Sequence, residues 1–396
     1  MTYYLLPKTN NITYKYLECI ENKGDMNPVI SFSLASYLYE IKQKIEEKGM
    51  NWDTYKKYTN PYEYIQGIVP GKKKSVSKYK PLSRSYFKML EILKTFDFNF
   101  PSSDLKTFHL AEGPGGFIEA MVNTRYCKSD TYIGISLLDD KNDPTIPSWK
   151  KSDVFLRENS NVFIENAQDG DGDILSLNNF LYCREKYKSS MHFITADGGF
   201  DFSTDFNKQE ININKLLFAQ AVYAISMQKK GGSFVLKIFD CFMQHTIDII
   251  YLLSSFYQKI YIMKPHSSRY ANSEKYLICK GFLYDSCDKQ FPYLLNVFTK
   301  MITIDTNNIF RFLNIPISNY FITKLEEYNA IFGQQQIENI YYTISLIDSK
   351  NSSEKVDLLI KSHIQKCVQW CNKHNVNANT NLQIQDNIFT TDSSFI

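Results

Sequence analysis

The sequence predicts an α/β protein built around a mostly parallel β-sheet. Between about residues 106 and 282, short runs of β-branched and aromatic residues alternate with longer stretches of helical hydrophobic spacing. The first of these runs ends in a glycine-rich turn, "EGPGGF", and continues as a helical pattern. The segments before and after this region have mainly helical patterns. A regular alternation of strands and helices is typical of parallel sheets that are covered by helices.

The expected elements follow in order along the chain. Strands are expected at residues 107–112, 131–137, 161–167, 191–199, 233–239, 259–265 and 274–282, and helices at residues 115–124, 214–228 and 245–257. The helix at 214–228 is expected to end at "KKGG", because glycine adopts the left-handed conformation that closes many helices.

The chain is expected to divide into three segments. Residues 1–80 form a mostly helical extension with a basic segment, 81–285 form the α/β domain, and 286–396 form a mostly helical extension that ends in a disordered tail from about residue 375.

The amino-acid composition excludes several classes of protein. The chain has 396 residues, of which 43% are hydrophobic, and a formal net charge of +3. This apolar content argues against extended disorder, and the small charge means that an acidic partner must be recognised by local clusters. No run of about 18 uncharged apolar residues is present, and the first residues do not resemble a signal peptide. The eight cysteines contain no CxxC pair. We therefore expect an intracellular, cytoplasmic protein with reduced thiols and no contact with a membrane.

The glycine-rich turn indicates a ligand site. A turn between a strand and a helix presents backbone N–H groups and a helix N-terminus at the carboxyl edge of the sheet. Glu112 would repel a pyrophosphate, and the turn lacks the GxGxxG and GK[ST] patterns of nucleotide sites. A carboxylate suits a ligand with a positive charge or an amino group, so S-adenosylmethionine fits better than NAD or ATP. The alternative is a turn with only a structural role.

Acidic residues follow two later strands of the predicted sheet. Asp171 and Asp173 come after the third strand, where a carboxylate can accept a hydrogen bond from an adenine amino group. Asp197 ends the fourth strand and precedes two glycines, which allow a ligand to approach closely. The alternatives are an acidic loop for the first pair and an ordinary strand-end cap for Asp197.

Separated pieces of the chain resemble the FtsJ/RrmJ-like RNA 2'-O-methyltransferase family, in the family's order. They are "SRSYFKMLEI", "LAEGPGGF", "ADGGF", and "FVLKIF" followed by "KPHSSRYANSEKYLICKGF". The forms "AEGPGGF", "GDI" and "ADGGF" are similar to the cap-directed branch, which includes proteins of large cytoplasmic DNA viruses. The resemblance covers roughly residues 80–285. It implies a Rossmann-like S-adenosylmethionine-dependent methyltransferase fold, with a seven-stranded sheet and helices on both faces.

The same resemblance implies methylation of RNA at a ribose 2'-hydroxyl, on the first transcribed nucleotide of capped mRNA. The expected partners are RNA, in the form of capped mRNA, and other capping enzymes. Two alternatives stay open. One is methylation of ribosomal or other internal RNA sites, and the other is a catalytically inactive RNA-binding or scaffold subunit.

Matching motif to motif assigns the family's catalytic tetrad to Lys88, Asp197, Lys237 and Glu274. Lys237 is the expected base, because the neighbouring cation of Lys88 and partial burial favour a neutral amine. The two carboxylates would orient the amines and the hydroxyl. The implied cofactor contacts are Glu112, Gly113, Pro114, Gly115, Gly116, Phe117, Asp173 and Asp197. No metal takes part in this scheme.

One position departs from the pattern of many methyltransferases, which carry an acidic residue at the end of the second strand to bind ribose hydroxyls. Here Asp139 and Asp140 come two or three positions late, so the ribose contact is unassigned.

A basic segment ahead of the α/β domain is the expected RNA contact. It interleaves lysine and arginine with Tyr79, Tyr86 and Phe87, and such aromatic rings can stack on bases. The RNA-binding residues that we expect are Lys73, Lys74, Lys78, Arg84 and Arg269. The alternative is a solvated basic linker.

A cluster of histidines and cysteines near the C-terminus has helical spacing. His363, Cys367, Cys371 and His374 share one helical face. A helix that rises about 1.5 Å per residue spreads them over roughly 16 Å, which is too far for one metal ion. A buried helix face is therefore expected, and no metal site.

Overall fold

The computed structural model describes residues 3–10, 12–138, 149–199, 207–349 and 352–379. Its centre is an eight-stranded sheet in the order β1-β8-β9-β7-β6-β3-β4-β5. The strands are β1 (Tyr3–Leu5), β3 (Lys106–Leu110), β4 (Thr131–Ile135), β5 (Val162–Ile164), β6 (Met191–Ala196), β7 (Gln228–Ile238), β8 (Tyr257–Met263) and β9 (Lys275–Phe282). Strands β5, β4, β3, β6 and β7 run parallel, and β9 is antiparallel to both of its neighbours. The strands expected from the sequence are all present, and β1 adds an antiparallel edge strand beside β8.

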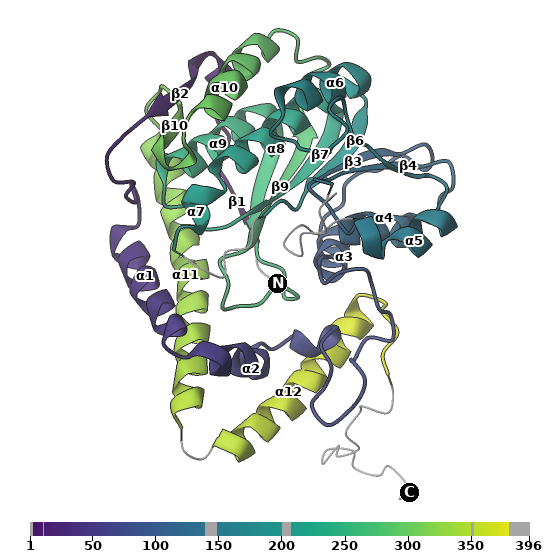
Figure 1. Cartoon of the computed structure of the whole chain (residues 1–396), viewed down its shortest axis with the longest axis vertical. Helices are drawn as coiled ribbons and strands as arrows, with labels where there is room; N and C mark the ends of the chain where they lie inside the picture. Colours follow the sequence, from purple (N-terminus) through teal and green to yellow (C-terminus); the bar gives the residue numbers. More distant parts are fainter. Residues whose placement is uncertain (1–2, 11, 139–148, 200–206, 350–351, 380–396) are drawn as a thin grey trace, which may run out of the picture.

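Helices cover both faces of the sheet (Figure 1). One face carries α3 (Ser85–Thr95), α4 (Gly116–Arg125) and α5 (Asp153–Glu158), and the other carries α6 (Leu177–Tyr187), α8 (Asn214–Met227) and α9 (Gln244–Phe256). Because successive residues of a strand point to opposite faces, each central strand contributes to two cores. On β7, for example, Phe234 and Leu236 join the core beneath α8 and α9, whereas Val235 joins the core beneath α3 and α4.

One expected boundary is wrong. The helix α8 ends at Met227, and Lys229–Gly232, expected to close this helix, belong to β7. Gly231 has a φ of 78°, and the pairing of β6 with β7 shifts register between Met191 and Phe193. Gly231 therefore allows an irregular turn of the backbone within the strand, and it does not cap a helix.

The flanks contain short strands that the sequence did not reveal. In addition to β1, β2 (Leu17–Glu21) pairs with β10 (Ile309–Leu313) as a separate antiparallel ribbon. The expected helical character of both flanks is otherwise present, in α1 (Phe32–Glu46), α2 (Gly49–Thr59), α10 (Phe291–Thr303), α11 (Asn319–Asp348) and α12 (Ser352–Lys373). The remaining short helices are η1 (Thr13–Tyr16), η2 (Glu63–Ile65), η3 (Trp149–Lys151), η4 (Thr306–Asn308) and α7 (Gln209–Asn212).

The two flanks pack on each other. Helices α1 and α2 contact α11, and α12 contacts α2 and η2. Figure 1 shows these helices as an arm that extends around one side of the sheet domain. The expected division of the chain at residues 80 and 285 stays a prediction. The expected tail lies mostly outside the described residues, although Ala378 still pairs with Ser77.

The cysteine and histidine side chains of α12 are buried. Cys367 and Cys371 join the core beneath α3, where Trp370 contacts Phe87, and His363 and His374, the latter just after α12, are also buried. All eight cysteines are free thiols. In the part of the chain that the structure describes, no helix is both long enough and apolar enough to cross a membrane.

Candidate active site

The glycine-rich turn joins β3 to α4 and fixes the position of α3. Gly115, at the N-cap of α4, has a φ of 101°, which glycine adopts without steric cost. A Cβ atom on Gly116 would lie 2.2 Å from Ser85 Oγ and 2.3 Å from Ser83 Oγ. Only glycine therefore lets the start of α4 contact the start of α3, the helix that carries Lys88.

Glu112, the first residue of the turn, is a buried carboxylate with an unused oxygen. Its side chain accepts a hydrogen bond from the backbone N–H of Phe117 through Oε1. Burial, and then the charge of Asp197, raise the pKa of Glu112 well above its ordinary value. Its Oε2 has no hydrogen-bond partner among the residues that the structure describes. Because a buried polar atom without a partner is costly, this oxygen fits a ligand that brings a donor or a positive charge.

A cavity of about 1470 Å³ opens beside this turn, at the carboxyl edge of the parallel strands. This volume exceeds the roughly 300–1000 Å³ of a typical small-molecule site, so the cavity has room for a cofactor and a second substrate. Of the expected cofactor residues, Gly113, Pro114, Asp173 and Asp197 line it. Glu112, Gly115, Gly116 and Phe117 lie behind the wall. The Phe117 ring is fully buried, so it anchors the turn in the core and does not face the cavity.

The loop after β5 brings Asp173 to the cavity. A Cβ atom on Gly172 would lie 2.2 Å from the carbonyl oxygen of Ser136, and Gly172 has a φ of 68°. This close approach joins the loop to the end of β4. Asp173 Oδ1 accepts a hydrogen bond from the backbone N–H of Leu175, and burial raises the pKa of Asp173. Asp139 and Asp140, which left the ribose contact unassigned, lie outside the described residues.

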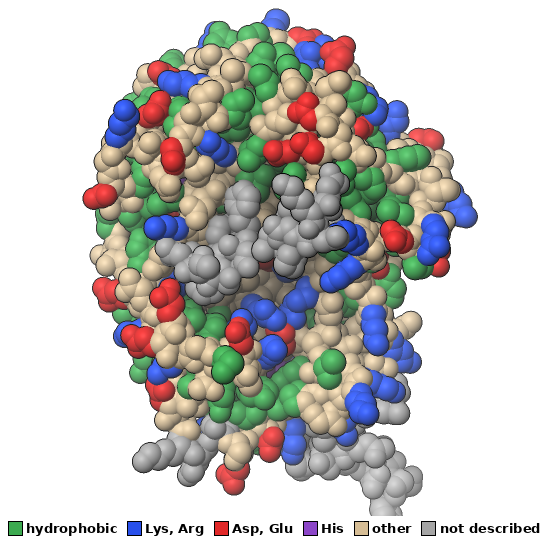
Figure 2. All heavy atoms as spheres, viewed as in Figure 1, with side chains coloured by type: hydrophobic (Ala, Val, Ile, Leu, Met, Phe, Trp, Pro, Cys, Tyr) green, Lys and Arg blue, Asp and Glu red, His purple; other side chains and the backbone are tan. Residues whose placement is uncertain are grey.

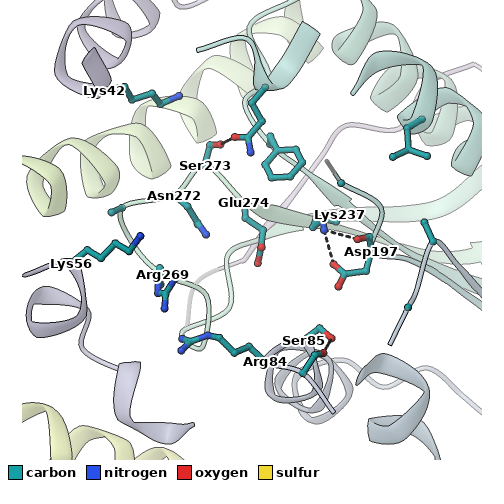
Figure 3. Close-up of a pocket in the computed structure, with 18 of the residues that line it drawn as sticks. Lys42, Lys56, Arg84, Ser85, Asp197, Lys237, Arg269, Asn272, Ser273 and Glu274 are labelled. Carbon is teal, nitrogen blue, oxygen red and sulfur yellow. Dashed lines mark hydrogen bonds and ion pairs between the residues drawn. The ribbon is translucent and has the colours of Figure 1, made fainter. Parts of the chain in front are cut away.

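The expected catalytic residues come together as two ion pairs. Lys237 Nζ lies 3.1 Å from Asp197 Oδ1, and Lys88 Nζ lies 2.7 Å from Glu274 Oε1. Figure 3 shows Lys237, Asp197 and Glu274 pointing into the same cavity. Lys88 is not one of the lining residues and reaches Glu274 from α3. Four residues that are separated by up to 186 positions therefore share one site.

A tyrosine that the sequence did not reveal lies between the two pairs. Tyr276 Oη is 3.2 Å from Asp197 Oδ1 and 3.2 Å from Glu274 Oε1. Burial raises the pKa of Tyr276 well above its ordinary value, so the phenol keeps its proton and can donate to one carboxylate at a time. Its position two residues after Glu274, near the start of β9, was a usable signal.

The charge state of Glu274 is set by its partners. Burial acts to raise the pKa of Glu274, but Lys88 and Lys237 outweigh it and lower this pKa to about 2. Glu274 is therefore an anion at any pH at which an enzyme works.

Comparison with known proteins identifies the family. The model of the FtsJ-like methyltransferase family matches residues 81–282, which is half of the chain. The chain belongs to the FtsJ-like methyltransferase family. This membership confirms the predicted resemblance and the predicted Rossmann-like fold, and it agrees with S-adenosylmethionine as the cofactor.

Curated relatives of this FtsJ-like methyltransferase are named for cap methylation. Cap-specific mRNA (nucleoside-2'-O-)-methyltransferase 2 of Pongo abelii is 28% identical over 82% of this chain and 43% of its own length. Cap-specific mRNA (nucleoside-2'-O-)-methyltransferase 1 is 30% identical in Xenopus laevis, over 67% of this chain and 32% of that protein. The mouse protein of the same name is 32% identical, over 61% of this chain and 29% of that protein. The chain thus spans less than half the length of these relatives.

A buried lysine organises the loop that precedes Glu274 in this FtsJ-like methyltransferase. Lys264 Nζ donates to the carbonyl oxygens of Asn272, at 2.6 Å, and Glu274, at 2.9 Å. Burial lowers the pKa of Lys264 to about 7. Glu91 holds the other half of the loop, because it accepts the backbone N–H groups of His266 and Ser267. The sequence signal for Lys264 was a lone cation at the end of an apolar strand.

The RNA-binding residues that we expected in this FtsJ-like methyltransferase fall into two groups. Arg84 and Arg269 line the cavity, and Figure 2 shows Lys and Arg side chains gathered at this hollow. Lys73, Lys74 and Lys78 are exposed and do not line the cavity.

The aromatic residues of the basic segment serve mainly in packing. Tyr86 is only 7% exposed and Phe87 only 2%, so their expected availability for base stacking is wrong. Tyr79 is partly exposed, but its hydroxyl donates to Glu119.

Proposed function

We propose that this protein is an S-adenosylmethionine-dependent RNA ribose 2'-O-methyltransferase that acts on the first transcribed nucleotide of capped mRNA. The observation that carries the proposal is the pair of lysine–carboxylate contacts, Lys237–Asp197 and Lys88–Glu274, bridged by Tyr276 at the wall of one cavity. The cap-directed names of the curated relatives support the choice of substrate.

The cofactor would occupy the end of the cavity next to the glycine-rich turn. Gly113 and Pro114 line that end, Asp173 offers a carboxylate for an adenine amino group, and the unused oxygen of Glu112, just behind the wall, suits an amino group that reaches it. When bound, S-adenosylmethionine supplies a methyl group that is activated by the positive charge on sulfur.

Side chains of the proposed active site would orient the ribose 2'-hydroxyl and remove its proton. Lys237 Nζ accepts the proton of the 2'-hydroxyl as its oxygen becomes a nucleophile. Asp197, at 3.1 Å, orients this amine and stabilises the ammonium group that forms. Glu274 stays ionised beside Lys88 and can accept a hydrogen bond from the substrate. Tyr276 lies between the two carboxylates and donates its one proton to either of them.

The experiment measures methyl transfer from labelled S-adenosylmethionine to three short RNAs of equal sequence. The first carries an N7-methylguanosine cap, the second carries the same cap and is already 2'-O-methylated at its first nucleotide, and the third is uncapped. Wild type is compared with Lys237→Ala and with Lys230→Ala, a matched change of a half-exposed lysine on the same strand. We expect transfer to the first RNA alone, abolished by Lys237→Ala and retained in Lys230→Ala.

Other outcomes identify the alternatives. Equal transfer to all three RNAs indicates internal sites. Cofactor binding without transfer to any RNA indicates a non-catalytic RNA-binding subunit. The cytoplasmic location, a contact with other capping enzymes and the viral branch of the family stay predictions.

A further inference from the structure

A buried glutamate of the N-terminal flank joins two arginines at the rim of the cavity. Glu63 Oε1 lies 2.9 Å from Arg84 Nη1 and 2.8 Å from Arg269 Nη2. Its Oε2 accepts further hydrogen bonds from Arg84 Nη2, at 3.3 Å, and Arg269 Nε, at 3.0 Å. The carboxylate is 4% exposed, whereas the two arginine side chains are 29% and 32% exposed. One buried anion is thus shared by two partly exposed cations.

The geometry leaves donors for a ligand. Among the described residues, no acceptor is assigned to Nε of Arg84 or Nη1 of Arg269. Both arginines line the cavity that also contains Lys237 and Glu274. Figure 3 shows the two side chains directed into the same open space, near Glu274. The trio of Glu63 and the arginines carries a net charge of +1, which favours an anionic ligand.

Glu63 is itself held firmly. It lies in η2, and Asn60 Nδ2 donates to its Oε2 at 2.8 Å. The neighbouring side chains of Tyr64 and Ile65 are 2% exposed, and η2 packs against α12 of the C-terminal flank. Burial acts to raise the pKa of Glu63, but the hydrogen bonds and charges of Arg269 and Arg84 lower it to about 2, so the carboxylate is ionised.

We propose that Arg84 and Arg269 form a phosphate-binding fork for the RNA strand, and that Glu63 is the positioning residue that holds them. This inference rests on the proposed function and adds a role for the flanks, since Glu63 lies outside the segment 81–282 that the family model matches. Planar guanidinium groups bind phosphate through paired N–H donors. Two such groups repel each other unless an anion lies between them, and Glu63 supplies that anion without occupying every donor.

The test replaces Glu63 with glutamine and measures RNA binding and methyl transfer separately. The dissociation constant is measured by fluorescence anisotropy with a labelled capped RNA, and KM and kcat are measured on the same RNA. We expect a roughly tenfold or larger rise in both the dissociation constant and KM, the size of effect that loss of a charge-assisted contact causes. We expect kcat at saturating RNA and the affinity for S-adenosylmethionine to stay within about twofold of wild type, since the tetrad keeps its own contacts. Glu185→Gln, a change of a carboxylate that is 82% exposed, is the matched control.

A second pair of variants covers the case in which Glu63→Gln does not fold. Arg84→Lys and Arg269→Lys keep each charge at the rim but remove the planar fork, and both are expected to weaken RNA binding. An unchanged or tighter dissociation constant in the folded variants overturns the proposal. Because binding is measured without turnover, it tests the fork even if the wild type transfers no methyl group, the result that would defeat the proposed function.

Two RNAs distinguish the source of the phosphate. One is a capped dinucleotide, in which the triphosphate bridge supplies most of the phosphates, and the other is a longer strand with a 5'-hydroxyl. Weakening confined to the capped dinucleotide assigns the fork to the triphosphate bridge. Weakening confined to the longer strand, or shared by both RNAs, assigns it to the phosphodiester chain. Equal affinity of wild type and variants for both RNAs again overturns the proposal.

Discussion

Replacement of Glu274 with glutamine should destabilise the fold at neutral pH, and the loss should shrink in acid. In the folded protein the pKa of Glu274 is lowered from its ordinary value of 4.5 to about 2, with Lys88 and Lys237 outweighing the effect of burial. This gap corresponds to about 3 kcal/mol of stabilisation by the ionised carboxylate. Because the folded-state pKa is the lower one, the stabilisation is complete above pH 4.5 and is lost as the pH falls towards 2. At about pH 3.5, about 2 kcal/mol should remain.

The assay is urea unfolding of wild type and Glu274→Gln at several pH values between 3.5 and 7. The difference in free energy of unfolding should be constant from pH 7 to about 5 and should decrease below that. Glu338→Gln changes an exposed carboxylate and is the control. Equal stability of Glu274→Gln and wild type at pH 7, or a difference that does not vary with pH, would refute the assigned role of the two lysines.

Three further changes test the packing and the buried charges. Gly116→Ala should destabilise by about 1–3 kcal/mol in urea unfolding, because its Cβ atom would overlap Ser85 Oγ. Arg311→Met should cost about 3–5 kcal/mol, because it leaves the fully buried carboxylate of Asp248 without its ion pair. Burial and Asp240 raise the pKa of Glu210 from 4.5 to about 7, so the folded state holds a proton that the unfolded state releases. Stability of the wild type should therefore fall as the pH rises from about 5 to 8, and Glu210→Gln should remove this decline.

Each of these three predictions can be contradicted by a specific result. Gly24→Ala, in an exposed loop, should leave the free energy of unfolding almost unchanged. If Gly116→Ala has an equally small effect, the close contact with Ser85 does not constrain this position. Lys324→Met breaks an exposed ion pair and should destabilise the protein much less than Arg311→Met does. A similarly small cost for Arg311→Met would show that Asp248 does not depend on its partner. Parallel pH profiles of wild type and Glu210→Gln would contradict the raised pKa.

The sequence predicted the sheet well because its apolar strands alternate regularly with helices along one segment of the chain. The resemblance to the FtsJ/RrmJ-like family assigned the four tetrad residues, which lie on α3 and at or near the ends of β6, β7 and β9. The sequence did not reveal β1, β2 or β10, which have three to five residues each. These three strands lie outside the regular alternation of strands and helices, and their pairing depends on partners that lie more than 250 positions away.

Site residues that act through long-range contacts were also missed. Glu63 lies in the short helix η2 among aromatic and apolar neighbours, and nothing local indicates that Arg84 and Arg269 converge on it. Tyr276 occupies a strand position that an apolar residue could fill equally well. Conversely, aromatic and basic residues in one segment suggested RNA stacking, but Tyr86 and Phe87 are used in the core. Composition identifies candidate residues, and burial decides which are available.

The pairing of β1 with β8 constrains the order in which this protein can fold during its synthesis on the ribosome. β1 pairs with residues 261–263, and β2 pairs with residues 309–313. At about 5–20 residues per second, roughly 10–50 s separate the synthesis of β1 from that of its partner. During that time the N-terminal strands have no native edge to join, whereas the parallel strands and their helices already can collapse. Since η2 packs against α12, whose residues 352–373 are synthesised last of the described elements, the packing that supports Glu63 can be completed only after those elements have been made.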